Sequence, residues 1–269
     1  MPSAAVVGLG LMGGSLGLAL REAGWSVTGL DRDPAAAAEA ARRGAIGQAL
    51  PSLEEAAGSD LVVLAVPVLA VRRLLAEIPA GTLVTDVAST KAEVLAWAAE
   101  AGVDFVGGHP LCGSERSGVE AARADLFQGA VWALTRRHPL IESMVVATGA
   151  RPFVVDAEEH DRLVAGTSHA AFAISAAYML AAADSADWPA MAPLSAGGFR
   201  DMTRLAGGDA EMYAGVLATN AANVEQRLRE FQTKLAELVA QLEGDPEAVR
   251  GWFERARQAR LDWDASRER

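Results

Sequence analysis

The stretch Val6-Val7-Gly8-Leu9-Gly10-Leu11-Met12-Gly13-Gly14-Ser15 decides the fold of this chain. It begins with an apolar run typical of a buried strand, and residues 15–23 continue it as an Ala/Leu-rich segment that predicts a helix. The glycines between them have the spacing of a dinucleotide-binding turn. Gly8 permits the tight turn, Gly10 lets a pyrophosphate approach the backbone, and Gly13 lets helix and strand pack closely. The helix N-terminus would face the phosphates with its positive end.

Residues 25–30 predict a second strand, which ends at Asp31, 18 positions beyond Gly13. An acid there accepts hydrogen bonds from the adenosine ribose 2′-hydroxyl and repels a 2′-phosphate, so the sequence predicts NAD rather than NADP. The neighbouring Arg32 weakens that preference. The structural alternative is a glycine turn in an α/β fold that holds no nucleotide. The predicted cofactor-binding residues are Gly8, Gly10, Leu11, Met12, Gly13, Asp31, Val66, Pro67 and Ser89.

Composition narrows the function classes. The chain has 269 residues, 51% of them hydrophobic, and a net charge of −11, which argues against general binding of nucleic acid or anionic membranes. Cys112 is the only cysteine, so we expect neither an intrachain disulfide nor a cysteine-based metal site, and a reducing cytoplasm fits. The first strand follows Met1 so closely that we expect no signal peptide. The apolar run 170–183 is shorter than the ~20 residues of a membrane span and predicts a helix buried on all sides.

Strand and helix patterns alternate up to about residue 150. This alternation predicts a doubly wound parallel sheet of the Rossmann type, in the α/β class. A helix over 89–101 is expected to take Ser89 or Thr90 as its N-cap. The further strands are expected at 61–66, 82–85, 103–106, 130–135 and 152–155.

From Asp156 the strand patterns cease and helical patterns continue to the end. We therefore expect a nucleotide-binding domain over residues 1–153 and an all-α substrate and dimerisation domain over 154–269. A helix is expected to open at Gly197-Gly198, and residues 220–242 form a long amphipathic helix. So much alanine in the helical half favours a homodimer, with a compact monomer as the alternative.

Polar residues follow the strands where a ligand of a parallel sheet binds, at the carboxyl ends. Asp86-Val87-Ala88-Ser89-Thr90-Lys91 follows one strand and Gly107-Gly108-His109-Pro110 another, so we expect His109 in a loop beside the nicotinamide. A neutral histidine suits removal of a hydroxyl proton near neutral pH, and Ser89 could hydrogen-bond the same hydroxyl. Spacing alone leaves a structural loop histidine equally open.

These motifs, together with His160-Asp161 and Gly197-Gly198-Phe199-Arg200-Asp201-Met202-Thr203-Arg204, resemble the prephenate/arogenate dehydrogenase family of tyrosine biosynthesis. The resemblance extends from residue 4 to about 242. It implies NAD(P)-dependent oxidative decarboxylation of a cyclohexadienol to a phenol. It also implies that His109 removes the hydroxyl proton, with Ser89 as its catalytic partner, while hydride leaves for the nicotinamide. The residues that it implies for substrate binding are Arg204, Ser114, Glu115, His169 and Arg200, with Arg204 holding a carboxylate.

One position departs from the family. Many members that use prephenate have a second histidine three residues after the one matching His169, whereas this chain has Phe172. That residue is linked to the substrate side chain, so arogenate stays open as the substrate. Asp161 is expected to pair with a basic group.

Two other classes remain as alternatives. A β-hydroxyacid dehydrogenase or imine reductase typically places a catalytic lysine in the second domain, but the only lysine beyond Lys91 is Lys234, in the amphipathic helix. A non-catalytic NAD-sensing protein would not need the set Ser89, His109 and Arg204.

Overall fold

The computed structural model describes residues 1–113, 116–242, 244 and 246–267. By its internal contacts the chain forms two compact units, Met1–Ala221 and Ala222–Arg269, which are described separately. The predicted boundary at residues 153/154 stays a prediction about domain organisation.

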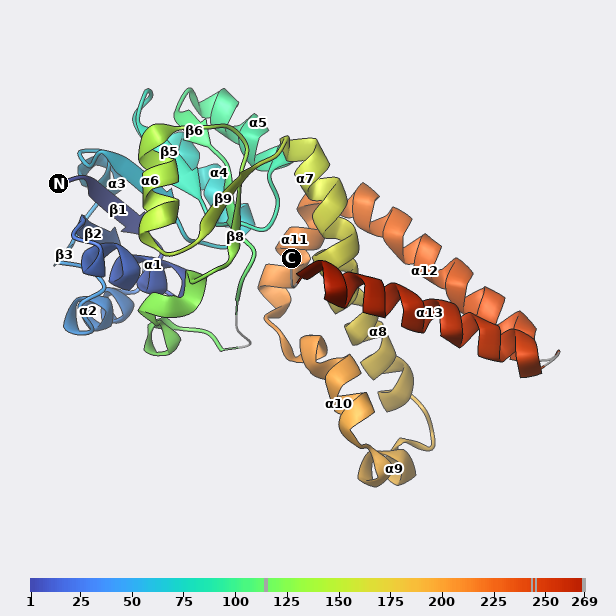
Figure 1. Cartoon of the computed structure of the whole chain (residues 1–269). Coiled ribbons are helices and arrows are strands. Elements are labelled where there is room, and N and C mark those ends of the chain that lie inside the picture. The colour runs from blue at the N-terminus through green and yellow to red at the C-terminus, as the bar shows by residue number, and fades with distance from the viewer. Residues whose placement is uncertain (114–115, 243, 245, 268–269) are drawn as a thin grey trace. The chain divides into compact units, whose positions relative to one another are not determined.

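A six-stranded parallel sheet forms the centre of the first unit, in the order β3-β2-β1-β4-β5-β6 (Figure 1). Helices cover both faces, and all four residues of the central strand β4 are buried. This confirms the doubly wound Rossmann-type fold. The strands are β1 (Ser3–Val7), β2 (Ser26–Leu30), β3 (Gln48–Ala49), β4 (Leu61–Leu64), β5 (Leu83–Asp86) and β6 (Asp104–Val106), and the helices are α1 (Leu11–Glu22), α2 (Pro34–Arg42), α3 (Leu53–Ala56), α4 (Val68–Glu77), α5 (Ala92–Ala101) and α6 (Pro139–Ala147).

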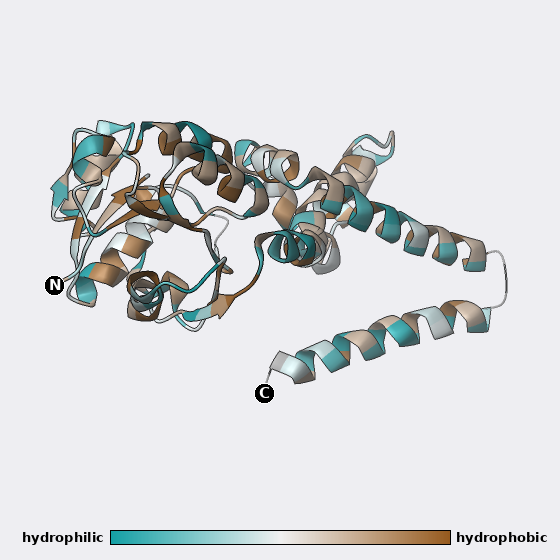
Figure 2. Cartoon of the chain, turned by 90° about the horizontal axis from the view of Figure 1, so that it is seen from above, coloured by the Kyte–Doolittle hydropathy of each residue, from teal (hydrophilic) through white to brown (hydrophobic). Residues whose placement is uncertain are grey.

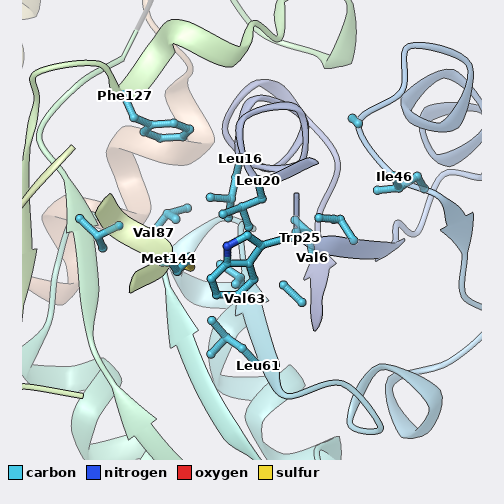
Figure 3. Packing of buried hydrophobic residues seen from close by; sticks show 14 of the residues in the cluster. Val6, Leu16, Leu20, Trp25, Ile46, Leu61, Val63, Val87, Phe127 and Met144 are labelled. Atoms are coloured by element: carbon cyan, nitrogen blue, oxygen red, sulfur yellow. The ribbon is translucent and has the colours of Figure 1, made fainter. Parts of the chain in front are cut away.

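Two clusters of apolar side chains hold the layers together. One contains Leu16 and Leu20 of α1, Val63 of β4 and Met144 of α6, packed around Trp25 (Figure 3). The other lies on the opposite face, where helices α4 and α5 contact each other and the strands. Burial of these side chains, at ~25 cal/mol per Å², is the main stabilising contribution to the sheet.

The strands expected at 130–135 and 152–155 do not extend the parallel sheet, which corrects the sequence-based topology. They are β8 (Val131–Leu134) and β9 (Arg151–Val154), and with β7 (Gly108–Pro110) they form a separate three-stranded sheet. Only one residue separates β7 from β6, which is too few for the crossover that two consecutive parallel strands need, so β7 cannot lie parallel beside β6. It pairs with β8 instead, in the antiparallel direction.

Helical structure follows: α7 (Ala157–Val164), a π-helical turn over Ala165–His169, α8 (Ala170–Ala183), α9 (Trp188–Met191), α10 (Gly197–Thr203) and α11 (Ala210–Thr219). In a regular helix Asp161 and His169, eight residues apart, would be separated by about 80° around the axis. The π-turn contains one extra residue, so their spacing counts as seven, which is two turns. Both side chains therefore lie on the same buried face.

The helix over 170–183 is not buried on all sides within this unit, contrary to the expectation. Phe172 and Ser175 are buried, whereas Tyr178 is 45% and Leu180 58% exposed. With α7 and the π-turn it forms one helix of 27 residues, Ala157–Ala183, whose length and composition would allow it to cross a membrane. Core helices of other proteins pass the same test, and this helix carries buried polar residues.

The second unit consists of α12 (Ala221–Leu242) and α13 (Pro246–Arg267). Both helices carry hydrophobic and hydrophilic residues along their length (Figure 2). The amphipathic helix expected at 220–242 is confirmed, but of its apolar stripe only Val224 is buried, and Phe231 and Leu235 are exposed.

Candidate active site

The glycine turn between β1 and α1 has the geometry that its spacing predicts. Gly8 has a φ of 91°, and a Cβ on Gly13 would lie 1.8 Å from the carbonyl oxygen of Gly8, so neither position has room for a side chain. A Cβ on Gly10 would meet no atom within 4 Å. Packing within the protein therefore does not require glycine at position 10. A pyrophosphate that approaches the backbone at the N-terminus of α1 would require it, because a side chain there would occupy the same space. The turn therefore fits a pyrophosphate.

The remaining predicted cofactor residues surround this turn. Asp31 ends β2, and its carboxylate accepts hydrogen bonds from the N–H groups of Leu9 (2.6 Å) and Asp33 (2.9 Å). Val66 and Pro67 follow β4, and a Cβ on Gly8 would approach Val66 Cγ1 to 2.7 Å. The structure thus places the acid and the β4 end beside the glycine turn. Leu11 and Met12 begin α1 and pack partly against the core.

A buried ion pair fixes the backbone in front of His109. Lys91 Nζ bonds the Asp86 carboxylate at the end of β5, and both side chains are almost fully buried. The same lysine donates to the carbonyl oxygen of Gly108 (2.7 Å), while the N–H of Gly108 donates to Asp86 (2.8 Å). Both backbone groups of the residue preceding His109 are therefore held by one ion pair. Burial raises the pKa of Asp86 and lowers that of Lys91, while their mutual attraction opposes both shifts.

His109 lies in the short strand β7, not in a loop as expected, and is 8% exposed. Its Nδ1 is 2.9 Å from Nε2 of His160, whose Nδ1 is 2.8 Å from Oδ1 of Asp161. A carboxylate only accepts, so His160 carries its proton on Nδ1 and its Nε2 is an acceptor. His109 then donates from Nδ1, which leaves Nε2 as its basic nitrogen. Among the described residues that Nε2 has no hydrogen-bond partner.

The surroundings keep His109 neutral. Burial lowers its pKa well below the usual 6.5, and the nearby His160, Lys91 and His169 lower it further. A neutral imidazole with an unprotonated Nε2 is the form that can accept a proton from a ligand hydroxyl.

Asp161 also caps α5, which corrects the expectation of a Ser89 or Thr90 cap. Its carboxylate accepts from the N–H groups of Lys91 (2.8 Å) and Ala92 (2.9 Å), and Ala92 begins α5. Thr90 instead bonds Thr219 (2.8 Å), and Ser89 is partly exposed in the segment between β5 and α5. The expected basic partner of Asp161 is His160.

The other buried histidine, His169, has the opposite arrangement. Asn220 Nδ2 donates to the backbone oxygen of Asp161 (2.8 Å) and lies 3.1 Å from His169 Nδ1. The proton of His169 is therefore on Nε2, which is buried and, within the described residues, has no well-aligned hydrogen-bond partner, although the Ser89 backbone lies nearby. Burial lowers the pKa of His169 to about 4; His160 lowers it further, while Asp161 and the Ser89 backbone act against the shift.

An aromatic stack continues from His169. Its ring is 5.9 Å from that of Phe172, which stacks on Tyr213 with 4.1 Å between ring centres and an angle of 6°. The Tyr213 hydroxyl donates to the carbonyl oxygen of Leu205 (3.0 Å), one residue beyond Arg204. Arg204 lies close enough to lower the Tyr213 pKa, although burial raises that pKa overall.

The predicted substrate residues are thus only partly brought together. Hydrogen bonds join His109 to His169 through His160, Asp161 and Asn220. Arg204 is exposed beside Tyr213, without direct contact to His109 among the described residues. Arg200 is on exposed α10, 3.8 Å from its neighbour Asp201. The predictions for Ser114 and Glu115 lie outside the described residues.

Sequence reasoning missed the roles of Lys91, Asp86 and Asn220, and the His109–His160 bond. His160 was visible as part of a motif, but no spacing rule connects it to a residue 51 positions earlier. Although three histidines and Asp161 lie close together, no group of three or more His, Cys, Asp or Glu in the described part of the chain could hold a metal ion.

Both the strand-rich N-terminal part and the helical C-terminal part of the chain match known proteins. Residues 16–140 match the family model "Prephenate dehydrogenase, nucleotide-binding domain", and residues 156–254 match "Prephenate dehydrogenase, dimerization domain". The prephenate dehydrogenase of Lactococcus lactis is 32% identical over 268 residues, which cover 95% of this chain and 75% of that protein.

Solved structures agree. Prephenate dehydrogenase from A. aeolicus, in complex with hydroxyphenyl propionate and NAD+, has a TM-score of 0.84 and 26% identity, over 97% of this chain and 98% of that one. Synechocystis arogenate dehydrogenase has a TM-score of 0.79 and 26% identity, over 98% and 99%.

Proposed function

Because the chain belongs to the prephenate dehydrogenase family, we propose that it converts prephenate to 4-hydroxyphenylpyruvate by NAD-dependent oxidative decarboxylation, a step of tyrosine biosynthesis. The observation that carries this proposal is the neutral His109 with its basic Nε2, in the strand β7 that directly follows β6, the last strand of the sheet that carries the glycine turn. NAD accepts the hydride of this reaction when it is bound.

His109 is the general base. Its Nε2 takes the proton of the ring hydroxyl as the adjacent ring carbon gives up hydride and the ring carboxylate leaves as carbon dioxide. The low pKa keeps the nitrogen unprotonated in the resting enzyme. Ser89, three residues beyond the end of β5 and partly exposed, would hydrogen-bond the same hydroxyl.

Arg204 supplies the positive charge that an acidic protein needs for a dicarboxylate. Its guanidinium is exposed, so it is open to a bidentate bond with a substrate carboxylate. His169 contributes its Nε2–H, and Arg200 a second cation on α10. Ser114 and Glu115 complete the proposed substrate set.

The cofactor is held by the glycine turn, Asp31 and the β4 end. Asp31 favours the free 2′-hydroxyl of NAD over the 2′-phosphate of NADP. Its two bonds to backbone N–H groups fix the carboxylate at the edge of the turn.

Arogenate is the second candidate substrate, and the stack of Phe172 on Tyr213 supports it. A keto acid side chain would gain a hydrogen bond from a donor at position 172, and Phe172 has an apolar ring that cannot donate one. A structural neighbour, the Synechocystis enzyme, is an arogenate dehydrogenase.

One assay tests these proposals: NADH or NADPH absorbance with prephenate or arogenate as substrate and NAD or NADP as cofactor. We expect turnover with prephenate and NAD. Turnover with arogenate alone would assign the second substrate, and no turnover with either would overturn the proposal. A β-hydroxyacid or imine substrate would then be examined, although Lys234 is exposed on α12 and paired with Glu237.

We also propose a cytoplasmic homodimer that associates through the helical domain, residues 154–269. The name of the matching family model and the exposed Phe231 and Leu235 on α12 support it. Light scattering coupled to size exclusion would report a mass near twice 28.0 kDa, and a mass of one chain would contradict it.

A further inference from the structure

The hydrogen bonds around His109 form a chain of three groups with a single direction. Asp161 accepts from His160 Nδ1 (2.8 Å), and His160 Nε2 accepts from His109 Nδ1 (2.9 Å). The rings of the two histidines meet edge to face, with their centres 5.1 Å apart. All three side chains are buried, with 8%, 3% and 2% of His109, His160 and Asp161 exposed.

We propose that His160 and Asp161 are positioning residues, which hold His109 in the tautomer with a basic Nε2 and share the charge that it acquires on taking the substrate proton. The proposal rests on the role of His109 as the base, given above. It extends that role to two side chains of α7, and so makes the base depend on the packing of α7 against β7 and α5.

The step balances within the proposed reaction. The O–H bond of the ring hydroxyl breaks, and its proton bonds to Nε2 of His109. The electron pair left on oxygen forms the new bond to carbon as hydride leaves that carbon for NAD. His109 then carries N–H at both nitrogens, and its positive charge is shared as the Nδ1 proton moves toward the lone pair of His160 Nε2. When the ring carboxylate leaves as carbon dioxide, the electron pair of its C–C bond passes through the ring to the oxygen, which takes back a proton to give the phenol. No residue is oxidised or reduced.

The hydrogen bonds of Asp161 fix its carboxylate as the acceptor for the Nδ1 proton of His160. Besides His160 it accepts from two backbone N–H groups at the start of α5, so its carboxylate is fixed in orientation. The proton of His160 is consequently fixed on Nδ1, and that of His109 follows. A buried carboxylate behind a histidine has the same effect in serine hydrolases, where it sets the tautomer and stabilises the imidazolium.

His160 offers a clean separation between this role and the packing of the helices. His160→Phe removes both ring nitrogens but leaves the Asp161 bonds that cap α5. We expect kcat to fall about 100-fold, within the range for general base catalysis, with the KM for NAD changed less than about twofold. Long-range 15N–1H NMR of histidine-labelled apo protein should show His109 as a mixture of tautomers instead of Nδ1–H alone.

His160→Gln supplies the rescue. Its side-chain oxygen can accept from His109 Nδ1 but cannot carry the positive charge, so we expect the wild-type tautomer and a kcat about tenfold below wild type. This variant also keeps the proposal testable if the bulkier phenylalanine impairs folding.

Thr219→Val is the matched control, because it removes a buried hydrogen bond to Thr90 in the same region without touching the three groups. We expect it to lower stability and leave kcat within about twofold. A pure Nδ1–H tautomer of His109 in His160→Phe, or a Thr219→Val loss of kcat as large as that of His160→Phe, would overturn the proposal. The NMR result needs no turnover, so it separates failure of this inference from failure of the proposed reaction.

Discussion

At the residue scale, His109 and His169 show how hydrogen-bond partners assign different chemistry to the same side chain. His109 donates from Nδ1 and keeps a basic Nε2, whereas His169 accepts at Nδ1 and presents an Nε2–H donor. In the reaction proposed above, the first would act as a base and the second as a hydrogen-bond donor. Both rings are neutral in the resting protein, because burial lowers the pKa of each.

His109→Asn tests the base. We expect kcat to fall by about 10²- to 10⁴-fold, because the amide cannot take the hydroxyl proton. NAD affinity, measured by isothermal titration calorimetry, should stay within about twofold, since the glycine turn is untouched. Near-normal turnover would remove His109 from this role.

Arg204→Leu tests the carboxylate site. Loss of a charge-assisted pair should raise the KM for substrate by ~10- to 100-fold, equivalent to about 1.5–3 kcal/mol, with a smaller effect on kcat. The KM of Arg204→Leu is compared with that of Arg200→Leu, because Arg200 is the proposed second cation and its guanidinium, on α10, is exposed like that of Arg204. An unchanged KM in the Arg204 variant would show that another cation holds the carboxylate.

At the element scale, the positions of the strand ends could be predicted from the sequence, but the pairing of β7 and the cap of α5 could not. The glycine turn, the acid after β2 and a histidine after β6 follow from local pattern, because the carboxyl ends of parallel strands meet at one edge. The strand β7 has three residues, too few for a periodic pattern, and its antiparallel pairing depends on β8, more than twenty residues later. The cap of α5 comes from Asp161, 70 positions beyond Lys91.

The ion pair between Lys91 and Asp86 gives an element-scale prediction. Lys91→Met should lower the free energy of unfolding by about 3–5 kcal/mol, because it leaves the Asp86 carboxylate buried and unpaired. Urea unfolding followed by circular dichroism measures this. The double variant Lys91→Met/Asp86→Asn should recover part of the loss, and a double variant that is no more stable than the single one would contradict the explanation.

At the scale of the whole molecule, every described residue of the proposed site lies within Met1–Ala221, and none comes from α12 or α13. Helices α7 to α11 belong to the same compact unit as the sheet, because Asp161, Thr219 and Asn220 bond residues of the nucleotide half or of each other's helices. Sequence pattern locates where strands stop, near residue 155, but not which helices then pack back onto them.

Overall stability should decrease in mild acid. Burial keeps the pKa of His169 at about 4, against 6.5 when unfolded, with His160 adding to the decrease and Asp161 opposing it. Between these values the unfolded chain binds more protons, so the free energy of unfolding falls as pH falls, by about 3 kcal/mol for this group. The buried His109 adds in the same direction. Urea unfolding at pH 7, 5.5 and 4.5 measures the slope, which His169→Asn should reduce; an unchanged slope in that variant would contradict the assignment.

The π-turn over Ala165–His169 has a consequence for how insertions and deletions in the gene would affect this site. A chain shorter by one residue there could form a regular helix, in which Asp161 and His169 are seven residues apart and still on the same face. The wide turn therefore lengthens the helix by one residue without turning His169 or Phe172 away from this face. A one-codon deletion there should keep the direction of both rings and change only the helical turn itself.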